Sequence, residues 1–195
     1  MLRDVFIVSA TRTPIGKYNG ALAHLPAPRL GAHLVRHLLL RYPQVQDQID
    51  EVILGCAIPA GLGQNPARQA AVFGGIAEKT PACTISSACG SGLDSVIAGS
   101  QMIQSGEAEI VLCGGMESMS QCPRIIGRGA EERETMLHDG LLCALTGEHM
   151  ADTAERPCDG AGVLAAGTRC VRPAEPRASD RGARCGILCR RNRAT

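Results

Sequence analysis

The chain is poor in aromatic residues, with no Trp, two Tyr and two Phe among its 195 residues. Proteins that bind single-stranded nucleic acid stack the bases on aromatic side chains, so this scarcity argues against such a function. The formal net charge of +1 is too small to favour a polyanionic partner or a membrane surface. We therefore expect no nucleic-acid partner and no membrane partner.

The sequence also lacks the patterns of a membrane span and of a signal peptide, which bears on its cellular compartment. No stretch approaches the roughly 18 apolar residues of a membrane span, and the first ten residues lack the layout of a cleavable signal peptide. Ten Cys could indicate a disulfide framework, but thiols that are not exported should stay reduced. The sequence therefore predicts a cytoplasmic protein with free cysteines.

Strand and helix patterns alternate along the first part of the chain. Short runs rich in β-branched residues predict strands at 5–10, 49–55, 83–86 and 109–115, the first of them buried. Apolar residues at helical spacing predict helices that begin near Pro28, after Asn65 as N-cap, and just after Cys89. This alternation predicts an α/β layered domain, followed by a loop-rich segment.

Cys89 lies at the third predicted junction between a strand and a helix. The free N–H groups and the positive end of the helix dipole at such a junction stabilise a thiolate. Gly90 and Gly92 keep side chains out of the approach path, so a substrate carbonyl could reach backbone N–H groups that serve as oxyanion donors. Cys89 is therefore our candidate nucleophile. The alternative is a small buried Cys that packs where the helix meets the strand.

Several blocks of sequence, in one order, resemble the N-terminal half of the thiolases, the family that makes or cleaves 3-ketoacyl-CoA. Five blocks match at 12–17, 49–55, 60–69, 89–93 (Cys-Gly-Ser-Gly-Leu) and 114–120 (Gly-Gly-Met-Glu-Ser-Met-Ser), and a sixth at 149–155 resembles the family's His-Met-Gly-x-Thr-Ala-Glu segment. The resemblance implies a thiolase-type layered fold with a mixed sheet over 1–119. It also implies a partial loop domain, which binds coenzyme A, over 120–155.

By this resemblance the protein is an acyltransferase, an acetyl-CoA C-acetyltransferase or a close 3-ketoacyl-CoA thiolase of fatty acid metabolism. Cys89 would attack the thioester carbonyl of an acyl-CoA, release CoA, and hold the acyl group until a second acyl-CoA carbanion captures it. The family's CoA contacts carry over onto Leu141, His149 and Met150, although His149 could also be an ordinary surface histidine. Acyl-CoA and CoA are then substrates, and the resemblance implies no cofactor and no metal. The block 114–117 is expected to be structural.

The family's catalytic set is incomplete in this sequence. By the resemblance, an Asn-Glu-Ala motif, a Gly-His-Pro histidine and a second catalytic cysteine belong to a second half, and none of the five histidines here stands in a Gly-His-Pro setting. The alternative to an enzyme is therefore an inactive truncated fragment. The family's homo-tetramer or dimer is not predicted for such a fragment. A ketoacyl synthase is a further alternative, against which the block 114–120 argues.

Residues 156–195 differ in composition from the rest, with nine Arg against three acidic residues, no Lys and four Cys. They show neither helical nor alternating periodicity, so we expect an unmatched, disordered tail. Our hypothesis is a GC-rich coding region read in a shifted frame, which an uninterrupted frame across codons 150–160 would contradict. The tail's four cysteines leave a zinc site as an alternative, and all ten leave a thiol redox protein. No Cys-x-x-Cys pair supports either.

Overall fold

The computed structural model describes residues 3–129, 131–154 and 187–191. The chain forms two compact units, one of residues 1–123 with 183–195 and the other of residues 124–182. The first unit therefore runs four residues past 119, where the sequence analysis placed the end of the α/β domain.

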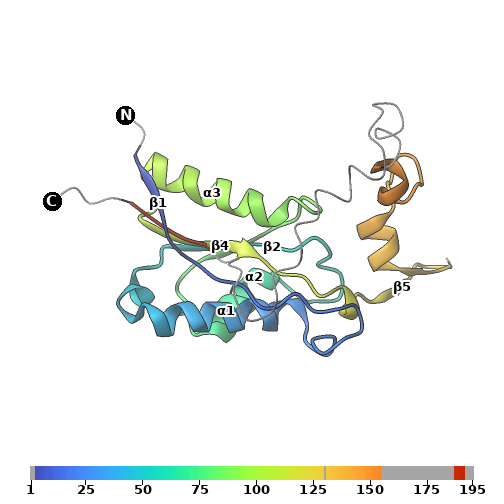
Figure 1. The fold of residues 1–195 in the computed structure, drawn as a ribbon, viewed down its shortest axis with the longest axis horizontal. Helices are drawn as coiled ribbons and strands as arrows, with labels where there is room; N and C mark the ends of the chain where they lie inside the picture. Colours follow the sequence, from blue (N-terminus) through green and yellow to red (C-terminus); the bar gives the residue numbers. More distant parts are fainter. Residues whose placement is uncertain (1–2, 130, 155–186, 192–195) are drawn as a thin grey trace, which may run out of the picture. The chain divides into compact units, whose positions relative to one another are not determined.

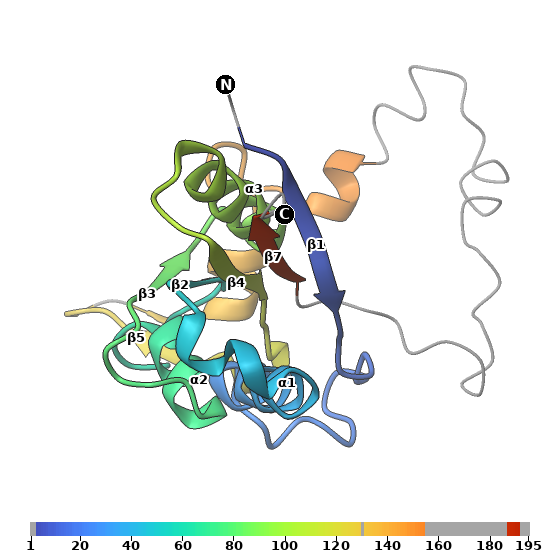
Figure 2. The same ribbon diagram turned by 90° about the vertical axis from the view of Figure 1, so that its left-hand side faces the viewer.

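A five-stranded mixed sheet forms the centre of the first unit. Its strands are β1 (Val5–Ala10), β2 (Glu51–Gly55), β3 (Ala82–Ile85), β4 (Ile110–Gly115) and β7 (Ile187–Arg191), in the order β1-β7-β4-β2-β3. Strand β2 pairs in parallel with β3 and β4, whereas β7 pairs antiparallel with β1 and β4. Figure 2 shows β7 between β1 and β4. The predicted α/β class is confirmed.

Helices cover both faces of this sheet (Figure 1). Helices α1 (Ala27–Arg41) and α2 (Pro66–Gly74) lie on one face, and α3 (Ser91–Ser105) lies on the other. Alternate residues of β2 point to opposite faces, so Val52 and Leu54 join the core under α1 and α2, while Ile53 joins the core under α3. Short 3-10 helices follow at Pro43–Gln48 and Met119–Gln121.

Two helices begin or end at the residues that the sequence predicts. The Asn65 side chain accepts a hydrogen bond from the Arg68 N–H at 3.1 Å, as expected of the N-cap of α2. Gly106 adopts a left-handed conformation, with a φ of 89°, directly after α3 ends. The helices predicted from spacing and capping are therefore confirmed.

Two sequence predictions fail in this sheet. Strand β1 was expected to be buried, but Phe6, Ile7 and Val8 are 47%, 61% and 43% exposed. The reason is topological, because β1 lies at the edge of the sheet and pairs with β7. The tail was expected to contain no folded element, yet Ile187–Arg191 forms β7 inside the sheet. The other tail residues lie outside the described part of the chain.

The second unit contains short elements. Strands β5 (Arg124–Ile126) and β6 (Glu132–Glu134) pair antiparallel, and a π-helix follows at Met136–Leu141. Leu142 and His149 then form an isolated antiparallel bridge, after which residues 150–154 are helical. Within the described parts of both units, no helix has the length and apolar character needed to cross a membrane.

Candidate functional site

Cys89 lies in a tight turn between β3 and α3. The Gly90 N–H donates to the Ser87 carbonyl at 3.0 Å. The Ser91 hydroxyl accepts from the Ser87 N–H at 2.8 Å and donates to the Ala88 carbonyl at 2.6 Å. Ala88 has a φ of 47°, in the left-handed region that non-glycine residues seldom adopt. These bonds hold the turn so that the Cys89 side chain is exposed, not packed in the core as the alternative reading required.

The first turn of α3 lies directly against the ends of two strands. A Cβ added to Gly55, the last residue of β2, would lie 2.3 Å from the Ser91 carbonyl carbon. A Cβ added to Gly115, the last residue of β4, would lie 3.1 Å from the Gly92 Cα. Such close approach of backbones is possible because all three positions are glycine. The sequence predicts that Gly92 allows substrate access, and the structure adds this packing role.

A buried serine fastens the same helix start to β4. Ser95 is fully buried, and its hydroxyl lies 2.7 Å from the carbonyl oxygens of Gly92 and Gly114. The hydroxyl also accepts the Gly114 N–H at 2.9 Å. One buried hydroxyl therefore fixes the helix start that follows Cys89 to the end of β4. Ser95 could not be identified from the sequence, because a serine within a helical pattern carries no specific signal.

Glu117 ties the segment after β4 to the segment after β2. Its Oε2 accepts the N–H groups of Ala57 at 2.7 Å and Ile58 at 3.2 Å. Burial raises the pKa of Glu117 above the usual range of a glutamate, although these backbone bonds act against the rise. The contacts agree with the structural role predicted for the block 114–117.

A second cysteine nearby has a very different environment. The Cys56 thiol is 1% exposed and lies 3.9 Å from Oε1 of Glu117. Burial, together with the negative charge of Glu117, raises the pKa of Cys56 to about 12. This thiol is therefore protonated at neutral pH and is a poor nucleophile. Cys89, by contrast, is exposed, so its sulfur is accessible.

The predicted CoA contacts belong to the second unit. Leu141 ends the π-helix and is half-buried, and Met150 is 41% exposed. The bridge from Leu142 to His149 brings both ends of this loop together. The His149 Nδ1 accepts the Ala151 N–H at 3.1 Å, so in the neutral imidazole the proton lies on Nε2. Cys89 belongs to the first unit and these three residues to the second.

Residues 13–18 line a cavity that the sequence did not indicate. The cavity has a volume of about 400 Å³ and lies between residues 13–18 and residues 117–120. Its lining does not include Cys89. Among the residues that the structure describes, no three His, Cys, Asp or Glu side chains gather as a metal site would require. The four tail cysteines proposed as zinc ligands lie outside the described side chains.

The chain is similar in sequence to proteins of one known family. The family model for the thiolase N-terminal domain matches residues 5–163, so the match continues past Arg156, where we expected the resemblance to stop. An acetyl-CoA acetyltransferase of Pseudomonas aeruginosa is 44% identical over 162 residues, which cover 79% of this chain and 41% of that protein. One from Escherichia coli is 42% identical over 163 residues, with the same coverage.

The fold comparison gives the same result. The crystal structure of the Acat5 thiolase from Ascaris suum in complex with coenzyme A superimposes with a TM-score of 0.79 at 33% sequence identity. The match covers 82% of this chain and 44% of that one. The chain thus spans about two fifths of the length of the curated relatives it matches. On its sequence and its fold, it belongs to the thiolase family.

Proposed function

We propose that this chain is an acyltransferase of the acetyl-CoA C-acetyltransferase type, which forms or cleaves 3-ketoacyl-CoA through an acyl thioester on Cys89. The observation that carries the proposal is the exposed Cys89 thiol in a fixed turn at the amino end of α3. The acetyl-CoA acetyltransferases among its relatives support the choice of substrate.

The acylation step uses the geometry of this turn. The Cys89 thiolate attacks the thioester carbonyl carbon, and the carbonyl oxygen becomes an oxyanion. The carbonyl re-forms, the carbon–sulfur bond to CoA breaks, and CoA leaves as a thiolate that takes up a proton. Cys89 then carries the acyl group as a thioester. No cofactor is needed, because the thioester itself supplies the leaving group.

The condensation step requires a base. A second acyl-CoA must lose a proton from the carbon next to its carbonyl before its carbanion attacks the Cys89 thioester. A carbon–carbon bond then forms, and Cys89 leaves as a thiolate. By family resemblance, this base belongs to motifs that the present 195 residues do not contain. Acylation of Cys89 is therefore the step that this chain's own residues support.

Coenzyme A would bind through the second unit. The Nε2–H of His149 could donate to an oxygen of CoA, since Nδ1 already accepts the Ala151 N–H. The partly exposed Leu141 and Met150 side chains offer apolar contacts for the pantetheine chain. The coenzyme A bound in the Ascaris suum relative supports this part of the proposal.

The direct test is covalent labelling. The protein is incubated with acetyl-CoA, and intact mass and peptide mapping locate any acetyl group. We expect one acetyl group on Cys89 and none on Cys83, which is also exposed among the described cysteines of the first unit. Cys89→Ser should abolish the thioester, and Cys83→Ser should leave it unchanged. Equal labelling of Cys83 and Cys89 would show non-specific acylation and defeat the proposal.

A turnover assay separates the enzyme from the inactive fragment. The protein is incubated with acetoacetyl-CoA and CoA, and the loss of substrate absorbance is followed. Turnover that Cys89→Ser abolishes establishes a working thiolase. Labelling of Cys89 without turnover restricts this chain to the acylation half of the reaction.

A further inference from the structure

Helix α1 has an outward face of one charge sign. Arg29, His33, Arg36, His37 and Arg41 are all exposed on it. The helix contains no Asp or Glu, and neither do the flanking residues back to 5 and forward to 46. Residues 52–77, which include α2, also contain none. This face of the first unit is therefore positive although the whole chain is nearly neutral.

A cavity opens on this face. Its volume is about 320 Å³, and Arg29, His33 and Arg36 of α1 line it together with Phe73 of α2. The rest of the lining is largely apolar and comes from Thr13, Pro14, Leu22, Leu25, Leu30 and Ala32. The volume is typical of small-molecule sites, which range from about 300 to 1,000 Å³.

The two arginines are fixed but not neutralised. The Arg29 guanidinium lies 4.0 Å from the centre of the Phe73 ring, and Nη2 of Arg36 donates to the Phe73 carbonyl at 2.8 Å. Within the described parts of the chain, no carboxylate pairs with either of them. Two oriented guanidinium groups without a counter-ion, beside an imidazole, form a site for an oxyanion, and a phosphate matches their planar donors best.

We propose that this cavity binds an organic phosphate. Arg29, His33 and Arg36 hold the phosphate, and the carbon skeleton lies against Leu22, Leu25 and Phe73. The site is separate from the nucleophile, because α1 lies on the face of the sheet opposite α3 and the cavity lining does not include Cys89. Binding here does not depend on the proposed acyl transfer.

Hexyl phosphate is a suitable probe, titrated calorimetrically into the full chain. We expect saturable 1:1 binding, weaker binding of inorganic phosphate and no binding of hexanol. Arg29→Gln and Arg36→Gln should each weaken the affinity by about 10-fold or more, because each removes charged hydrogen bonds to the phosphate.

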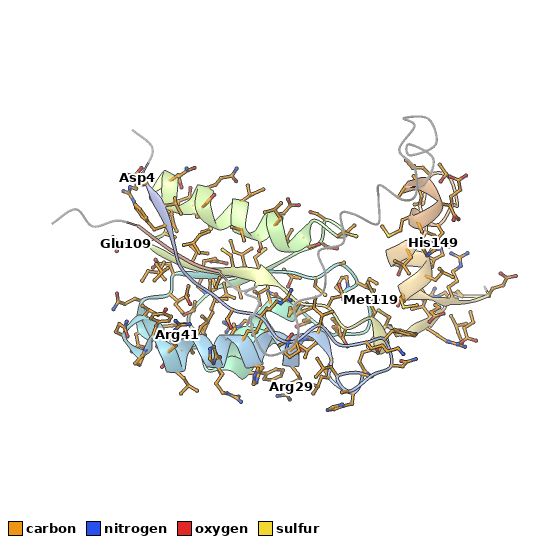
Figure 3. The ribbon with its side chains drawn as sticks, in the orientation of Figure 1. Asp4, Arg29, Arg41, Glu109, Met119 and His149 are labelled. Atoms are coloured by element: carbon orange, nitrogen blue, oxygen red, sulfur yellow. The ribbon has the colours of Figure 1, made fainter. Side chains whose placement is uncertain are left out.

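Arg41→Gln is the matched control. Arg41 is exposed on the same helix, its guanidinium lies 5.5 Å from the Tyr42 ring, and it does not line the cavity. Figure 3 shows Arg29 and Arg41 near opposite ends of α1. The Arg41 variant should bind hexyl phosphate with unchanged affinity. All variants should unfold at the temperature of the original chain, and the exposed His33→Gln replaces any arginine variant that does not fold.

Several results would overturn the proposal. They are the absence of saturable binding, an equal loss of affinity in Arg41→Gln, or a higher affinity for hexanoate than for hexyl phosphate. Equal affinity for inorganic phosphate would overturn the assignment of the apolar lining to the ligand's carbon skeleton. Acetylation of Cys89 should be the same in the arginine variants, so failure of either proposal can be recognised without the other.

Discussion

The two units differ in what stabilises them. The first has a hydrophobic core on each side of its sheet, with residues such as Val52 and Val111 completely buried. In the second, the described residues bury a single side chain, that of Thr135. Its Arg124–Glu132 ion pair is exposed, and such pairs contribute at most about 1 kcal/mol. The proposed nucleophile thus has a packed support, whereas the proposed CoA contacts are held mainly by backbone bonds.

The strongest test of this difference is truncation of an isoleucine in each unit. Ile103 is fully buried under the sheet, so Ile103→Ala should reduce the free energy of unfolding by about 2–5 kcal/mol. Ile126 of β5 is 76% exposed, so Ile126→Ala should change the free energy of unfolding by less than about 0.5 kcal/mol. Urea denaturation followed by circular dichroism measures both. Similar losses would contradict the comparison.

The next test adds one methyl group at a glycine in each unit. Gly55→Ala should destabilise the first unit by about 1–3 kcal/mol and slow acetylation of Cys89, because α3 must move away from β2. Gly129 has a φ of 71° and no atom within 4 Å of the added Cβ. Gly129→Ala should therefore cost only about 1 kcal/mol, from backbone strain, and leave acetylation unchanged.

The pH dependence of stability should reveal the half-buried carboxyl of Glu117 in the first unit. Burial raises the pKa of Glu117 in the folded chain, so the folded state binds more protons than the unfolded state just above the ordinary value of 4.5. The contribution of protonated Glu117 to the free energy of unfolding is greatest below pH 4.5. It is lost as the pH rises through the pKa that Glu117 has in the folded chain.

In Glu117→Gln, the contribution of Glu117 to the fall in stability with rising pH should disappear. Glu132 is exposed in the second unit, so Glu132→Gln should retain that contribution. Denaturation curves recorded at a series of pH values for the three proteins measure the effect. Burial also raises the pKa of Glu51, so part of the fall should remain. If stability falls with rising pH as much in Glu117→Gln as in the original chain, the raised pKa of Glu117 is not the cause.

The smallest effect concerns the turn before the nucleophile. An alanine in the left-handed conformation carries roughly 1–2 kcal/mol of backbone strain in the folded state, which a glycine avoids. A glycine, however, loses about 0.5–1 kcal/mol more backbone entropy on folding. Ala88→Gly should therefore be neutral or slightly stabilising. The same substitution at Ala98, inside α3, should destabilise by about 1 kcal/mol. Thermal unfolding compares the two. A clear destabilisation by Ala88→Gly would show that the turn depends on the alanine side chain.

The sequence by itself determined the local features of this protein. Helix starts and ends followed from short-range signals such as the Asn65 cap and Gly106, because capping involves residues only a few positions apart. Cys89 could be placed at a helix start for the same reason. The ordered motif blocks pointed to the family, which the comparisons then established.

Only the tertiary structure decided how distant segments meet. An apolar run such as 5–10 has the same local pattern in a central strand as at an edge, so the exposure of β1 and the insertion of β7 could not be predicted. The contact of Gly55 with Ser91, and the Phe73 contacts that orient Arg29 and Arg36, likewise join residues far apart in the chain. Sequence periodicity reports which residues prefer burial, but the pairing of strands and helices determines what each one contacts.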